Sequence, residues 1–152
     1  MPSAAHPVVM AALLRVVKDA LDPVRVIRGR DLSGDPSDIV LIGRENVDDL
    51  DWSSSGSFRQ AMQAFGGSRE EAGAVNSLII ARNGDADQDA VNATAFGYLA
   101  LIEAAVRADS TLGITTLEYI VAEIDAGDVL ERQGDDGATA ALRFIVAYKA
   151  RI

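Results

Sequence analysis

The stretch DDGATAALRFIVAYKARI (residues 135–152) alternates apolar and polar side chains and therefore predicts a β-strand. One face of this strand is apolar and consists of Leu142, Phe144, Val146, Tyr148, Ala150 and Ile152. The other face carries three cations, Arg143, Lys149 and Arg151. Fully extended, residues 138–152 would span about 50 Å, far more than a usual strand. We expect the excess to bend, to bulge or to lie against a neighbouring chain.

The residues before this strand predict a helix and two short strands. An apolar stripe at helical spacing marks 7–21 as a helix that ends before Pro23. Short apolar runs predict strands at 24–28 and 38–43, with glycines and a proline in the turn between them. We expect these two strands to form a meander.

Residues 43–73 are predicted to form a long exposed loop or hairpin. Within them, 58–65 (FRQAMQAF) fits either a strand or a helical turn, and 66–73 (GGSREEAG) is expected to interrupt it. A central strand is predicted at 74–82, where four apolar residues follow one another and an Asn-Gly pair ends the run.

A second helix is predicted at 90–109, with Asp85 and Gln88 at the spacing of a capping box. Its second half, FGYLALIEAAVRA (96–108), contains only Glu103 and Arg107 as charges, so it lacks a polar face. Helices of this kind are buried on more than one side, and one small domain has too little chain to cover both. The second cover is expected to be another subunit.

Strands at 114–124 and 128–132 complete the predicted order of elements. With one apparent helical crossover, the fold class is α+β, with a largely antiparallel or mixed β-sheet and two main helices in a single domain, 1–152.

Composition excludes several classes of function. The 152 residues include no cysteine, which excludes disulfides, thiolate catalysis and sulfur-ligated zinc. The net charge is −9, and residues 83–137 carry 12 acids against 2 bases, which argues against tight nucleic-acid binding. The apolar run at 8–14 is too short to span a membrane and lacks the features of a signal peptide, so we expect no membrane association and synthesis in the cytosol.

No motif predicts a catalytic residue, a metal ligand or a cofactor. The acidic run at 85–89 fails the calcium-loop pattern, because that pattern requires Gly and Glu where the chain has Ala90 and Phe96. His6 is expected to lie at a frayed end with nothing to pair it. The adjacent acids Glu70 and Glu71 are expected to be solvated.

The order of these features resembles the tail terminator proteins of long-tailed (siphovirus-type) bacteriophages. The resemblance covers most of the chain and rests on VRVIRG (24–29), DPSDIVLIG (35–43), the strand-to-helix unit ARNGDADQDAVNATAFGYLALIEAAVRADSTLG (81–113) and the closing GDDGATAALRFIVAYKARI (134–152). The Asn-Gly-Asp turn into a long Ala-rich helix, followed by RADSTLG and an alternating strand that ends in KARI, is the most specific combination.

The resemblance implies a ring-forming subunit, usually hexameric, at the head-proximal end of the tail tube in the virion. Such a ring stops polymerisation of the major tail tube protein and presents a surface to a head-completion or connector protein. DNA passes through its lumen without specific binding, and neither catalysis nor a cofactor is involved. The alternatives are another connector or head-completion protein of the neck, or a small non-viral α+β enzyme or ligand-binding domain.

Two surfaces are predicted to make these contacts. Subunits are expected to meet through the last strand and the second helix, by way of Arg143, Lys149, Arg151, Phe96, Leu99 and Ile102. The alternative for the cations is pairing within the chain across the sheet. Contact with the tube or neck is assigned to Asp48, Asp49, Asp51 and Trp52, although Trp52 equally fits a role as the plug of its own loop.

Overall fold

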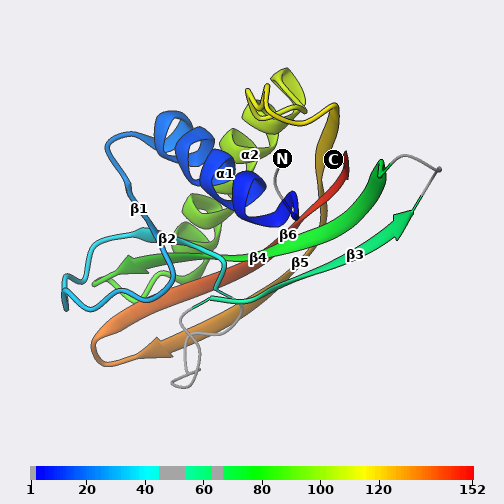
Figure 1. The fold of residues 1–152 in the computed structure, drawn as a ribbon. Coiled ribbons are helices and arrows are strands. Elements are labelled where there is room, and N and C mark those ends of the chain that lie inside the picture. The colour runs from blue at the N-terminus through cyan, green and yellow to red at the C-terminus, as the bar shows by residue number, and fades with distance from the viewer. Residues whose placement is uncertain (1–2, 45–53, 63–66) are drawn as a thin grey trace.

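The computed structural model describes residues 3–44, 54–62 and 67–152 and confirms the α+β class. Two helices lie on one side of a sheet that, among the described residues, has six strands (Figure 1). The elements are α1 (His6–Leu21), β1 (Arg25–Arg28), β2 (Ile39–Ile42), β3 (Gly56–Met62), β4 (Arg69–Asn83), α2 (Gln88–Ala108), β5 (Tyr119–Gly134) and β6 (Gly137–Arg151).

The predicted closing strand is β6, and it runs through the middle of the sheet. It pairs antiparallel with β4 from Ala138 to Arg151 and antiparallel with β5 along its other side. Its unusual length of 15 residues is accommodated within the chain, because β4 has 15 residues and β5 has 16. The one irregularity lies in β5 between Ile124 and Ala126, where the register shifts.

The strand order is β1-β2-β4-β6-β5, with β3 pairing the first half of β4 on the same side as β2. The predicted meander at 24–43 is wrong, since β1 and β2 run parallel. In a parallel pair, the chain has to run back along the length of the strands before the second strand can begin in the same direction as the first. Arg25 holds this connection by donating to the Ser37 Oγ (3.0 Å), the Ser33 Oγ (3.0 Å) and the Asp35 carbonyl (3.1 Å).

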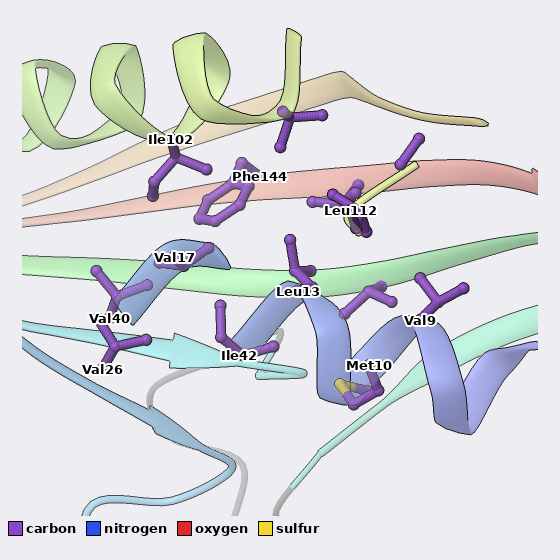
Figure 2. Packing of buried hydrophobic residues seen from close by; sticks show 14 of the residues in the cluster. Val9, Met10, Leu13, Val17, Val26, Val40, Ile42, Ile102, Leu112 and Phe144 are labelled. Atoms are coloured by element: carbon purple, nitrogen blue, oxygen red, sulfur yellow. The ribbon is translucent and has the colours of Figure 1, made fainter. Parts of the chain in front are cut away.

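The main core lies between the helices and the apolar face of β6. Figure 2 shows Phe144 of β6 pointing toward Ile102 of α2, with Leu13 and Val17 of α1 nearby, and all four side chains are buried. The even-numbered residues of β6 supply this layer, as the alternation predicted. A smaller cluster of Ile39, Leu41, Leu78, Ile80 and Ala141 is buried on the other face of the sheet.

Several element boundaries differ from the prediction. Residues 69–73 do not interrupt the sheet, because they form the start of β4. Since β4 pairs antiparallel with β3, the described part of 43–73 forms a hairpin, which is one of the two alternatives predicted for it. The strands predicted at 114–124 and 128–132 are one bulged strand, β5, which begins only at Tyr119. The predicted capping box is also wrong: the cap of α2 is Asp87, whose side chain accepts from the Ala90 N–H (3.1 Å).

Candidate interaction surfaces

The outward face of α2 is apolar and uncovered. Phe96 and Leu101 are 48% and 52% exposed, and they flank a row of small exposed residues, Ala93, Gly97, Ala100 and Ala104. Of the residues predicted to contact another subunit through this helix, Phe96 is therefore accessible. Leu99 is half-buried against the core. Ile102 is fully buried beneath the helix, so its assignment to a subunit surface is corrected: it is a core residue.

The cations predicted on the outer face of β6 lie on the side of the sheet away from the helices. Arg143 pairs with Asp128 of β5 (2.8 Å), and Arg151 pairs with Glu70 of β4 (3.1 Å). These are pairs across the sheet within the chain, the alternative stated for them. Lys149 is exposed and has no ion pair with any described residue. The predicted tube or neck residues Asp48, Asp49, Asp51 and Trp52 lie outside the described part of the chain.

A buried polar junction, which the sequence did not predict, joins α1 to β3, β4 and β6. The Glu71 carboxylate is only 1% exposed and accepts from the Ala5 N–H (3.0 Å), the Gln60 amide (2.8 Å) and the Tyr148 hydroxyl (2.7 Å). The His6 Nδ1 lies 3.2 Å from the Tyr148 hydroxyl. Two expectations are thereby corrected: Glu71 is not solvated, and His6 is not without partners.

The electrostatics of the junction follow from these contacts. Burial alone would raise the pKa of Glu71, but the hydrogen bonds it accepts outweigh burial, and its pKa lies below the usual value. Burial and the neighbouring Glu71 carboxylate raise the pKa of Tyr148. Burial lowers the pKa of His6, with Arg28 acting in the same direction and Glu71 against it.

The junction serves to attach α1 to the sheet. Glu71 lies at the N-terminus of α1, where a carboxylate satisfies otherwise unpaired N–H groups and faces the positive end of the helix dipole. Groups of the protein itself donate to both oxygens of this carboxylate, which is the pattern of a structural contact. One signal in the sequence could have indicated that Glu71 is buried. Glu71 lies on the same face of β4 as the buried residues Val75 and Ile79, because all three are odd-numbered positions of one strand.

The two lateral edges of the sheet differ in character. On β5, the exposed large side chains are Tyr119, Val121, Val129 and Leu130. Opposite, β3 pairs only with β4 among the described elements, and its Phe58 is 54% exposed. The residue of β4 that pairs with Phe58 is Gly73. A glycine is required there because a Cβ on Gly73 would collide with the ring of Tyr148.

The described residues contain no cluster of three or more His, Asp or Glu side chains able to hold a metal ion. No described helix is long and apolar enough to cross a membrane. A scan against protein-family models matched none of them, and a search of curated proteins found no match.

Proposed function

We propose that this chain is the subunit of a tail terminator ring in a long-tailed bacteriophage. The ring, a hexamer by the resemblance of the sequence, caps the head-proximal end of the tail tube and stops its growth. It then offers its free face to a head-completion or connector protein. The proposal assigns no catalysis and no cofactor.

The observation that carries the proposal is the uncovered apolar face of α2. A helix that packs only against its own sheet normally presents charges to solvent. Here the outward positions are small or large apolar side chains, with Phe96 and Leu101 about half exposed. Such a surface on a small domain is typical of a protein–protein contact.

The asymmetry of the subunit supports a ring over a two-fold dimer. Head-to-tail rings need two different surfaces on each subunit. The two edges of the sheet are unlike. Residues 83–137 carry 12 acids against 2 bases, whereas the rest of the chain carries 11 acids and 12 bases. An overall charge of −9 also suits a lumen through which DNA passes without binding.

The test is to add the purified chain to polymerising tail tube protein and to measure tube length and end labelling by electron microscopy. A terminator stops elongation and labels one end of each tube. Light scattering in parallel gives the native mass, with a species near six times 16.0 kDa expected for a free ring. Binding to the portal with no effect on tubes would instead identify a connector protein of the neck.

A further inference from the structure

The outer edge of β5 has two unlike halves. In the first half, the outward Ala122 N–H donates to the Ser110 carbonyl (2.8 Å), so the connection from α2 to β5 covers this half. Beyond the register shift, the outer side of residues 127–133 pairs with no described strand or loop backbone. We call these residues the open half of β5. An unpaired strand edge of this kind is a template for a strand of another chain.

Apolar side chains are uncovered on both faces of the open half. Val129 faces the helices and Leu130 faces away from them, and both are exposed. Asn92 of α2 donates to the Glu131 carboxylate, so this side of α2 faces the open half. Phe96 lies one helical turn further along the same side of α2 and is also exposed. The open half and the adjacent side of α2 therefore form one uncovered apolar surface.

Strand β1 forms the opposite edge of the sheet at the level of the open half. A row of paired residues crosses the sheet from β1 to β5 and consists of Val26, Val40, Ile79, Leu142 and Val129. Strand β1 is parallel to β2, and three antiparallel pairings lead from β2 to β5, so β1 and β5 are antiparallel to each other. A second copy placed beside the first, without a vertical shift, therefore brings its β1 opposite residues 127–130.

The backbone groups of the two edges are placed to pair. No described strand pairs with the outer side of β1. The Gly29 N–H donates to the Ile42 carbonyl of β2 (2.9 Å), and because alternate residues of a strand direct their backbone groups to the same side, Val26 directs its groups outward. Val129 also does so, because the register shift moves the outward positions of β5 from even numbers, such as Ala122, to odd numbers.

The shapes of the two edges also match. Strand β1 lies one strand further out than β3, because β1 pairs with β2, and β2 and β3 both pair with β4. On the opposite edge, Ser110 lies outside Ala122, at the level of Phe58 in β3. The edge that projects at β1 therefore meets an edge that recedes at the open half. The covered half of β5 has no place for a neighbour's β3, whereas the open half has a place for β1.

The two edges carry opposite charges. Lys18 lines a hollow between β1 and the end of α1, and both Lys18 and Arg28 of β1 are exposed without an ion pair to a described residue. At the β5 edge, Asp125 and Glu131 are exposed and have no ion pair in the described part of the protein. Opposite charges across a strand pair stabilise it, whereas like charges destabilise it. Contact between unlike edges is therefore favoured over contact between two β5 edges or two β1 edges.

We propose that β1 of one copy adds antiparallel to residues 127–130 of β5 in the next copy, so that the sheet continues from subunit to subunit. In this arrangement Lys18 lies near Glu131 of the neighbour, and Arg28 lies diagonally across from the neighbour's Asp125. The end of α1 lies beside the uncovered side of the neighbour's α2. The occupant of each edge is a second copy of this chain, joined head to tail, and the inference rests on the proposed ring.

The absence of cysteine allows a direct test by disulfide cross-linking. Two double variants combine Ile27→Cys with Asp128→Cys, which is opposite in the unshifted register, or with Leu130→Cys, which is opposite after a shift of two residues. Within one copy, three strands separate these positions, so a disulfide can form only between copies. After oxidation at increasing protein concentration, denaturing, non-reducing gels are expected to show a ladder of linked multimers for one of the two variants.

Matched controls use the same chemistry at positions that should not meet. Ile27→Cys combined with Val121→Cys, on the same face but in the covered half of β5, should stay unlinked. Ile27→Cys alone and Leu130→Cys alone should also stay unlinked, because a link would require two like edges to meet. Linking of Leu130→Cys alone would show that two β5 edges pair, and this result would overturn the proposal.

A charge reversal gives a second measurement that needs no cysteine. Lys18→Glu should weaken self-association roughly two- to fivefold, and Glu131→Lys in the same chain should restore it. Lys149→Glu makes the same change on the central strand β6, away from both edges, and should associate like the wild type. Analytical ultracentrifugation measures all three, and equal association of Lys18→Glu and Lys149→Glu would contradict the contact.

The outcomes separate this inference from the proposed function. Absence of linked species in both double variants at every concentration overturns the edge pairing. If wild-type protein nevertheless forms a discrete multimer or caps tubes, the ring stands and its contacts lie elsewhere. If the ladder forms but tubes grow unchecked, the edge pairing stands and the role as terminator fails.

Discussion

Glu71 is a single carboxylate on which three parts of the chain converge. It accepts hydrogen bonds from the start of α1, from Gln60 of β3 and from Tyr148 of β6. The neighbouring Glu70 points to the other face of the sheet and forms a half-exposed ion pair with Arg151. Two adjacent acids thus have opposite roles because successive side chains of a strand point to opposite faces.

The contrast between Glu71 and Glu70 predicts unequal effects of the same substitution at the two positions. Glu71→Gln keeps the shape of the side chain but replaces one acceptor oxygen by an NH2 group, which faces groups that are themselves hydrogen-bond donors. It should lower the free energy of unfolding by about 1–3 kcal/mol. Glu70→Gln removes the charge that pairs with Arg151 on the exposed face and should cost at most about 1 kcal/mol. Thermal and urea unfolding of both variants measure the difference. Equal effects would show that the buried carboxylate does not hold α1.

Acid should weaken the same junction through two groups. Because the pKa of Glu71 is lowered in the folded state, its contribution is present above the unfolded-state pKa and is lost as pH falls through the folded value. The pKa of His6 is lowered by burial, so the unfolded chain binds this proton first, below about pH 6.5. Both groups make stability rise with pH.

The prediction is that wild-type protein loses stability relative to His6→Gln as pH falls below about 6.5. Urea unfolding at a series of pH values between about 7.5 and 5 measures the two curves. Parallel curves would mean that His6 has no part in the acid response, and any remaining slope would then belong to carboxylates.

At the scale of elements, α2 begins at a cap two residues beyond the one that the sequence pattern favours. Asp87→Ala removes the acceptor for the Ala90 N–H and should cost about 0.5–2 kcal/mol. Asp85→Ala, at the position of the predicted capping box, should change stability by less than about 0.5 kcal/mol. Thermal unfolding monitored by circular dichroism compares the two, and a larger effect of Asp85→Ala would contradict the structure.

The two sides of α2 also predict opposite phenotypes for adjacent residues. Ile102→Ala should cost about 2–5 kcal/mol, because it empties part of the core. Leu101→Glu places a charge on the outward face and should leave the unfolding free energy nearly unchanged while reducing self-association by at least tenfold. Analytical ultracentrifugation measures the association.

Ala11→Glu on the exposed side of α1 is the matched control for Leu101→Glu, because it adds the same charge to the other helix. This control should associate like the wild type. Equal association of Leu101→Glu and Ala11→Glu would remove the outward face of α2 from the subunit contact.

At the scale of the whole molecule, the sequence predicted what depends on local periodicity. The alternation in 138–152 correctly gave β6 and its buried face, and the apolar stripe in 7–21 gave α1. The parallel pairing of β1 and β2 was missed, since strand direction depends on a connection whose path is not encoded in a short apolar run.

The candidate surfaces were predicted only in part, for a related reason. A helix apolar on nearly all sides has no polar stripe to mark its outward face, so Phe96 and Ile102 could not be told apart. The partners of Arg143 and Arg151 depend on the register of three strands. Glu71 was missed because a charged residue is usually exposed, and its burial depends on donors from α1, β3 and β6.

The central position of β6 governs how the chain folds as it is synthesised. Strands β4 and β5 both precede β6, and neither pairs with the other, so until β6 is made each lacks a main partner. The register joins Glu70 to Arg151, a contact between residues distant in sequence, and contacts of this kind form slowly. A nascent chain stalled before residue 137 therefore exposes the apolar residues Leu78–Ala81 of β4 and Tyr119–Ala122 of β5, and chains with such exposed segments are substrates of chaperones.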